Sequence, residues 1–84
     1  MNLERAILLV LLAANGDALS AVEIRRELPA FTRTAAALAE VTQTLNTLEE
    51  SQQILGTTGD REDANGRAML VYTLREKGRA RALR

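Results

Sequence analysis

Apolar residues with helical spacing dominate the first two thirds of the chain. Within residues 3–14 one apolar stripe consists of Ile7, Leu8, Leu11 and Leu12. A second stripe, within residues 35–52, has the 3-4-3 spacing that places its members on one helix face: Leu38, Val41, Leu45 and Leu48. The pattern therefore predicts two helices, each with one buried face.

A shorter helix is predicted between these two. Ser20-Ala21-Val22-Glu23 has the spacing of a capping box, in which the Ser and Glu side chains each accept a hydrogen bond from the other residue's amide. Pro29 ends this helix at about Leu28, because proline disfavours helical backbone in the residue before it. Residues 29–34 are predicted to be a connector, in which Thr32 or Thr34 caps the next helix.

The hydrophobic period changes from helical to alternating after residue 53. Residues 54–58 and 67–74 are predicted to be strands, with Leu70, Tyr72 and Leu74 facing inward from the second. Asn65-Gly66 lies between them and predicts a type I′ hairpin turn, which needs positive φ at both central residues. Residues 75–84 return to helical character, with Gly78 as a weak point. The predicted fold class is mainly α with a small β-hairpin (α+β).

The length and the side-chain inventory limit what the chain does. At 84 residues it is one domain, residues 1–84. It contains no Cys, no His and one Tyr, so disulfides, ordinary zinc sites and most catalytic bases are excluded. We predict no enzyme activity, no catalytic residue, no cofactor and no metal site. The formal net charge is zero, but residues 75–84 carry five cations against one anion, which suits a phosphate backbone or a helix end.

The N-terminal apolar run, residues 6–14, imitates a signal peptide. Glu4 stands where such a peptide needs a basic region, and Asn15-Gly16-Asp17 follows the run directly. The run is also too short to span a membrane. We therefore expect a cytoplasmic protein without a membrane partner.

The order of these elements resembles the winged helix-turn-helix regulators, closest to the PadR-like and MarR-like groups. Residues 6–24 are similar to the opening helix and the start of the second, and residues 41–50 to the recognition helix as it enters the hairpin, or wing. Tyr72-Thr73-Leu74-Arg75-Glu76-Lys77-Gly78-Arg79 is similar to the motif that closes the wing. The spacing from Leu28 to Leu48 suits the PadR-like arrangement better than a compact MarR-like turn.

The resemblance implies a three-helix core with a wing and a short C-terminal helix. It also implies a homodimeric transcriptional regulator that binds duplex DNA and often responds to a small-molecule effector, whose identity the sequence does not give. The recognition helix, about residues 35–52, would enter the major groove, and the wing, about residues 55–74, would lie on the flanking backbone or minor groove. Three positions depart from the family pattern: Gln52 and Gln53 stand where the family has Gly and an apolar residue, and Arg75 replaces the usual Thr.

Seven residues are candidates for DNA contact. Gln and Asn pair bidentately with adenine and Thr offers a hydroxyl and a methyl group, which selects three residues of the recognition helix: Thr42, Gln43 and Asn46. Arg61 and Arg67 flank the hairpin turn and are expected to hold phosphates or enter a minor groove. Arg33 and Thr34 are expected near phosphates at the N-terminus of the recognition helix.

Each of these signals also has a plain structural interpretation. Thr, Gln and Asn are common on solvated helix faces, the wing carries mixed charge, and Thr32 and Thr34 serve equally as caps. Leu9 and Val10 lie beside the first apolar stripe and are candidate dimer contacts, unless the wing and the last helix cover them. Glu40 and Glu50 would repel phosphates, so a winged-helix module that contacts another protein is the alternative function.

Overall fold

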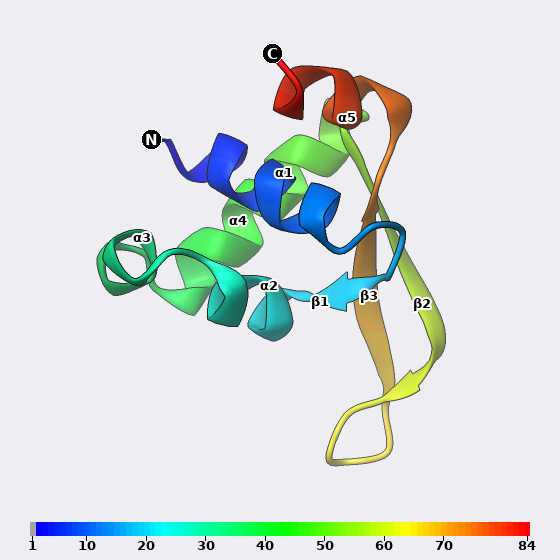
Figure 1. The fold of residues 1–84 in the computed structure, drawn as a ribbon. Helices are drawn as coiled ribbons and strands as arrows, with labels where there is room; N and C mark the ends of the chain where they lie inside the picture. The colour runs from blue at the N-terminus through cyan, green and yellow to red at the C-terminus, as the bar shows by residue number, and fades with distance from the viewer. Residues whose placement is uncertain (1) are drawn as a thin grey trace.

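The computed structural model describes residues 2–84, apart from the side chain of Asp60. The elements follow in the order α1 (Leu3–Ala13), β1 (Leu19–Ser20), α2 (Ala21–Glu27), α3 (Ala30–Ala35), α4 (Leu38–Glu50), β2 (Ile54–Glu62), β3 (Ala68–Leu74) and α5 (Glu76–Ala82). Three antiparallel strands form one sheet in the order β1-β3-β2. In Figure 1 the β2–β3 hairpin, the wing, projects beyond the helices.

The core forms where α1, α2 and α4 meet the base of the wing. Both predicted stripes contribute to it, and its largest fully buried side chains are Tyr72, Ile7, Leu8, Ile24, Leu45, Leu48, Ile54 and Val41. Leu38 is an exception, because it lies in the first turn of α4 and is exposed. The capping box is confirmed: Ser20 Oγ accepts from the Glu23 amide at 3.2 Å, and Glu23 Oε1 accepts from the Ser20 amide at 3.0 Å.

The prediction that residues 29–34 form a connector is wrong, because this segment contains most of helix α3. Pro29 precedes the helix, and its carbonyl accepts from the Arg33 amide at 2.9 Å. Arg25 of α2 donates to the carbonyls of Ala36 and Arg33, at 3.0 and 3.2 Å, and so satisfies the C-terminal end of α3. Helix α4 begins at Leu38, three residues later than predicted, and neither Thr32 nor Thr34 caps it, since its N-cap is Ala37.

The wing turn also differs from the prediction. Gly66 has a φ of 75°, but Asn65 is not among the residues of positive φ, so the turn is not type I′. The Gly66 amide donates to the Asp63 carbonyl at 3.0 Å, and Asp63 Oδ1 accepts from the amides of Asn65 and Arg67. This is the pattern of a type I turn followed by a left-handed glycine. The Asp63 carboxylate stabilises the turn by accepting hydrogen bonds from two of its backbone amides.

Burial along β3 follows the prediction only in part. Tyr72 is buried and Leu74 is partly buried, but Leu70 is exposed and Val71 is buried instead. Leu70 pairs with Thr58, beyond the two residues, Val71 and Tyr72, that pair with β1. At Leu70 the hairpin no longer packs against the helices. The alternation of apolar and polar residues along β3 therefore does not mark a buried face there.

The wing begins at a left-handed residue. Gln52 has a φ of 63°, and the amide of Gln53 donates back to the Leu48 carbonyl at 2.9 Å, which closes the end of α4. Although Gln52 stands where the family has Gly, it adopts the left-handed conformation that ends α4 and starts the wing. A left-handed conformation of a residue other than glycine costs roughly 1–2 kcal/mol. Gln53 is buried and links this end to α5, since its side-chain oxygen accepts from Arg81 at 2.9 Å.

Candidate nucleic-acid interface

Helix α4 presents one polar stripe to solvent. Val41, Leu45 and Leu48 are buried on its inner side. The opposite side carries four exposed residues at spacings of four, three and four: Ala39, Gln43, Asn46 and Glu50. Thr42 is exposed at the edge of this stripe, and its hydroxyl donates to the Leu38 carbonyl at 3.0 Å.

The two amides in the stripe are free to bind a partner. Gln43 and Asn46 lie three residues apart, so they are neighbours on the helix surface. Within the described part of the chain, neither side-chain amide makes a hydrogen bond. Each therefore offers a donor and an acceptor outward from the same turn of α4.

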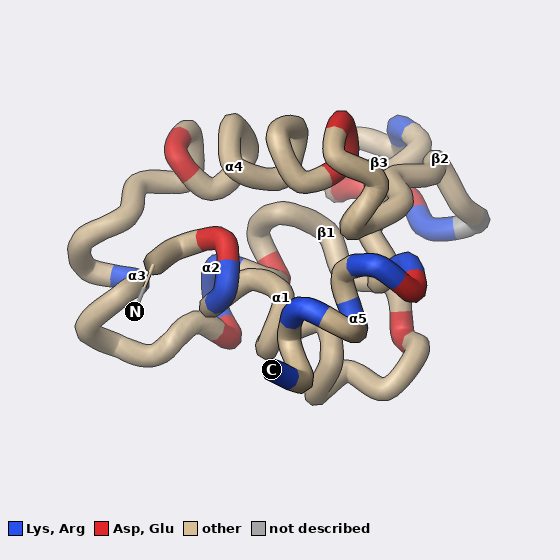
Figure 2. Tube along the Cα trace, turned by 90° about the horizontal axis from the view of Figure 1, so that it is seen from above, with Lys and Arg blue, Asp and Glu red and all other residues tan. Residues whose placement is uncertain are grey.

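The charge of α4 is entirely acidic. The helix carries Glu40, Glu49 and Glu50 and no Lys or Arg, and Figure 2 shows it with red segments near both ends and no blue. Glu49 turns toward the wing, where its Oε2 accepts from the Gly56 amide at 3.0 Å. A Cβ at Gly56 would crowd this carboxylate and the Tyr72 ring, so a glycine there allows β2 to start close against α4.

Arg61 is held by the protein itself. Its guanidinium makes two hydrogen bonds of 2.7 Å to the two carboxylate oxygens of Glu23 and a third, of 3.2 Å, to the Ala18 carbonyl. The hydrogen bonds that Glu23 accepts from the Arg61 side chain and from the Ser20 amide lower its pKa from the ordinary value of 4.5 to about 2. One carboxylate thus caps α2 and holds the wing, and Arg61 orients the wing in this structure instead of pointing outward.

Arg67 is the exposed cation at the tip of the wing. Its amide donates to Asp63 Oδ1 at 3.1 Å, whereas its guanidinium makes no hydrogen bond within the described residues. The Asp63 carboxylate fixes the backbone of this residue, and the hairpin that carries it extends beyond the helices (Figure 1).

Arg33 and Thr34 belong to α3 and not to the first turn of α4. Arg33 Nη1 donates to the Arg26 carbonyl at 2.9 Å, and Thr34 Oγ1 donates to the Ala30 carbonyl at 2.8 Å. Both side chains therefore stabilise the α2–α3 region. The free amides at the start of α4 follow Ala37, which brings no side-chain cap.

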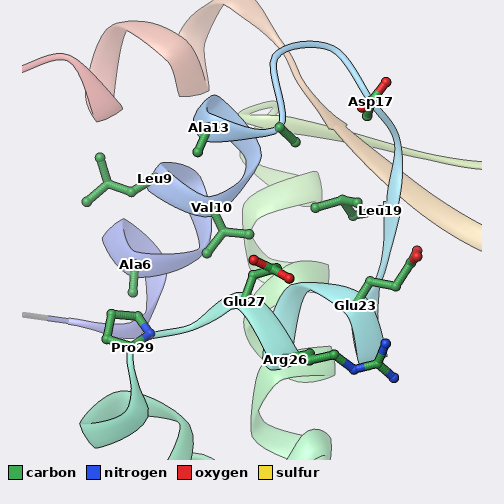
Figure 3. A pocket seen from close by; sticks show the side chains of 11 residues that line it. Ala6, Leu9, Val10, Ala13, Asp17, Leu19, Glu23, Arg26, Glu27 and Pro29 are labelled. Carbon is green, nitrogen blue, oxygen red and sulfur yellow. The ribbon is translucent and has the colours of Figure 1, made fainter.

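Leu9 and Val10 are partly buried against the core and line a hollow of about 500 Å³ between α1 and α2. Figure 3 shows apolar side chains of α1 around it, with Leu19 and Pro29, whereas α2 contributes charged groups; the charged residues are Asp17, Glu23, Arg26 and Glu27. The wing does not line the hollow, and neither does α5. The two residues are thus left at an open apolar surface.

The described residues contain no cluster of three or more His, Cys, Asp and Glu side chains that would hold a metal ion. In the same part of the chain, no helix has the length and apolar character needed to cross a bilayer.

The structure brings Thr42, Gln43 and Asn46 together on α4 and places Arg67 at the far end of the wing. The contacts that hold this arrangement were not predicted from the sequence; they are those of Arg25, of Glu49 and of the Glu23–Arg61 pair. The capping box identified Glu23, but no local pattern links it to a residue 38 positions away.

Comparisons with known proteins support the fold. No protein-family model matches the chain, and no curated protein sequence matches it. Among solved structures it is similar to ZitR of Lactococcus lactis, a zinc-responsive MarR family member, with a TM-score of 0.64 and 22% identity over 99% of this chain and 49% of that one. Two single-residue variants of ZitR match with TM-scores of 0.66 and 0.63, at 20% and 22% identity, over 95% and 99% of this chain and 46% and 49% of theirs.

The chain spans about half the length of these ZitR structures. At this identity the likeness shows the fold alone, a winged helix in which the β2–β3 hairpin is the wing. The structures that it resembles are MarR family members, while the PadR-like assignment stays a prediction.

Proposed function

We propose that this domain binds duplex DNA as a homodimer and regulates transcription. The observation that carries the proposal is the stripe on α4, where the Gln43 and Asn46 amides are exposed and without a partner among the described residues. The winged helix fold shared with a MarR family member adds support, since the sequence also resembles winged helix-turn-helix regulators.

In the proposed complex α4 lies in the major groove, which is wide enough to admit a helix. Thr42, Gln43 and Asn46 then contact base edges, and Arg67 contacts the flanking backbone or minor groove. Arg61 keeps the wing at its angle through Glu23, Arg33 ties α3 to α2, and Thr34 bonds within α3. We assign DNA contact to side chains that make no hydrogen bond within the protein, or that keep groups free for a partner, and structural roles to those that are bonded.

Leu9 and Val10 are the proposed dimer contacts. They line an open apolar hollow on α1, a surface that a second copy can cover. A two-fold dimer presents two α4 helices to a palindromic site, as helix-turn-helix proteins with two half-sites require.

One observation favours the alternative, a winged helix that contacts another protein. Helix α4 has three Glu and no basic residue, and this charge opposes a phosphate backbone. In that case the stripe would contact a polar or basic protein surface.

Fluorescence anisotropy separates the two functions. A random-sequence duplex and a duplex from the chain's own promoter region are titrated at low and at physiological salt. DNA binding predicts a preference for the promoter duplex and an affinity that falls linearly with salt on a logarithmic plot, with a slope of about −0.9 per phosphate contacted. Arg67→Ala should weaken binding, while the charge-matched control Arg84→Ala should not. Absence of binding to both duplexes at low salt would reject the proposed function and favour the alternative.

A further inference from the structure

We infer that the DNA half-site read by α4 is rich in A·T pairs, and that Gln43 and Asn46 contact adenine in it. This inference rests on the proposed function and specifies its ligand. It follows from which hydrogen-bonding groups the α4 stripe contains and which of them are already used inside the protein.

The stripe lacks the groups that recognise guanine best. Guanine presents two acceptors, O6 and N7, in the major groove, and the commonest specific contact to them is a bidentate one from Arg or Lys. No Arg or Lys occurs in α4. Three basic residues precede α4 within its N-terminal neighbourhood. Arg33 donates to the Arg26 carbonyl and Arg25 to the carbonyls of Ala36 and Arg33, and Arg26 belongs to α2, where it lines the hollow beside α1.

The two amides match adenine instead. Adenine presents the N6 donor beside the N7 acceptor, and a carboxamide presents an acceptor beside a donor. Opposite guanine, the carbonyl oxygen of the same amide would face another acceptor. Because Gln43 and Asn46 are exposed and spaced by three residues, both amides can reach bases from one turn of the helix.

The methyl groups beside the amides suit thymine. The single hydroxyl proton of Thr42 is donated to the Leu38 carbonyl at 3.0 Å, which leaves the methyl group and an acceptor for contacts outside the helix. Ala39 lies four residues before Gln43 on the same stripe and adds a second methyl group. Apolar contacts of this kind recognise the C5 methyl of thymine.

The carboxylates limit the A·T preference to part of the site. Glu49 is occupied by the Gly56 amide, but Glu40 and Glu50 are exposed, and a carboxylate accepts from N4 of cytosine. Glu50 lies at the C-terminal end of the stripe, so a G·C pair is compatible with that end of the half-site. Gln43 and Asn46 lie in the middle of the stripe, where the A·T pairs belong.

The test begins with selection of bound duplexes from a random pool by the full chain, followed by anisotropy on the selected duplex. We expect A·T pairs at the centre of each half-site. Replacing its adenines by 7-deazaadenine removes the N7 acceptor but leaves base pairing intact, and should weaken binding about ten-fold per contacted base. Replacing the guanines of the same duplex by 7-deazaguanine is the matched control and should have little effect.

Three variants assign the contacts to residues. Gln43→Ala and Asn46→Ala should each remove the sensitivity to 7-deazaadenine at one position, and Gln43→Arg should shift the preference there from adenine to guanine. Binding to G·C-rich duplexes with sensitivity to 7-deazaguanine would overturn this inference but leave the proposed function intact. Failure to select any duplex, with a folded protein by circular dichroism, would instead overturn the proposed function.

Discussion

At the scale of single residues, the close approach of one backbone segment to another decides which positions require glycine. Gly78 was expected to weaken the last helix, because glycine is a poor helix former. In the structure it is buried, and a Cβ there would overlap the backbone carbonyl of Gln53. That carbonyl also accepts from the Arg75 amide at 3.0 Å, so it is fixed in place.

We therefore predict that Gly78→Ala destabilises the domain, against the gain of about 1 kcal/mol that helix propensity alone would give. The clash with backbone should cost roughly 1–3 kcal/mol, as overpacked sites do. The urea midpoint measures the change. Ala80→Gly, at an exposed position of the same helix, should show the ordinary propensity loss. A Gly78→Ala protein of higher midpoint than the parent would contradict the packing described here.

At the scale of elements, one carboxylate connects the start of α2 to the wing. Glu23 completes the capping box and binds Arg61 in a bidentate pair, and the two side chains are 29% and 46% exposed. Because the pair is this exposed, its contribution to stability is modest and screened by salt. Its main consequence is the angle of the wing relative to the helices.

Glu23→Gln tests this connection, because glutamine preserves the capping box but removes the ion pair. Hydrogen exchange should become faster in β2 of the variant, whereas exchange in α2 should change little. The matched variant Arg61→Gln should give the same result. Unchanged exchange in β2 for both variants would show that the pair does not hold the wing.

The pair also predicts a dependence of stability on pH. The folded pKa of Glu23, about 2, lies below the ordinary value of 4.5, so the charged carboxylate stabilises the folded state above pH 4.5. This contribution is lost as the pH falls from about 4.5 toward 2. The Tm difference between the parent and Glu23→Gln should therefore be constant near neutrality and shrink over that interval. A difference that grows on acidification would contradict the assignment.

The same elements show what could be predicted from sequence. The stripes of α1 and α4 and the cap at Ser20 were predicted because each depends on neighbours within a few residues. Helix α3 was missed because Arg25 of α2 completes its end, and β1 because it consists of two residues that exist as a strand only through pairing with β3. The role of Arg61 depends on a contact across 38 positions, which no local pattern encodes.

At the scale of the whole molecule, the domain leaves two surfaces available on different helices. One is the polar stripe of α4, and the other is the apolar hollow between α1 and α2. In the proposed dimer the second surface pairs two copies, so that the first can be presented twice.

Val10→Lys should therefore shift the protein from dimer to monomer in sedimentation velocity, because it places a charge in the hollow. Leu9→Lys should act in the same direction. Val22→Lys introduces the same charge at an exposed valine of α2 outside the hollow and should leave the dimer intact. A parent protein that is monomeric at high micromolar concentration would contradict this interface.

The most direct test of DNA recognition by α4 is a ¹H–¹⁵N correlation spectrum of the full chain, titrated with the duplex it binds best. We expect amide shifts to concentrate in residues 39–50 of α4 and at the wing tip around Arg67, with the largest shifts including those of the Gln43 and Asn46 side-chain amides. Shifts confined to α1 and α2, or no shifts at any duplex concentration, would contradict this expectation.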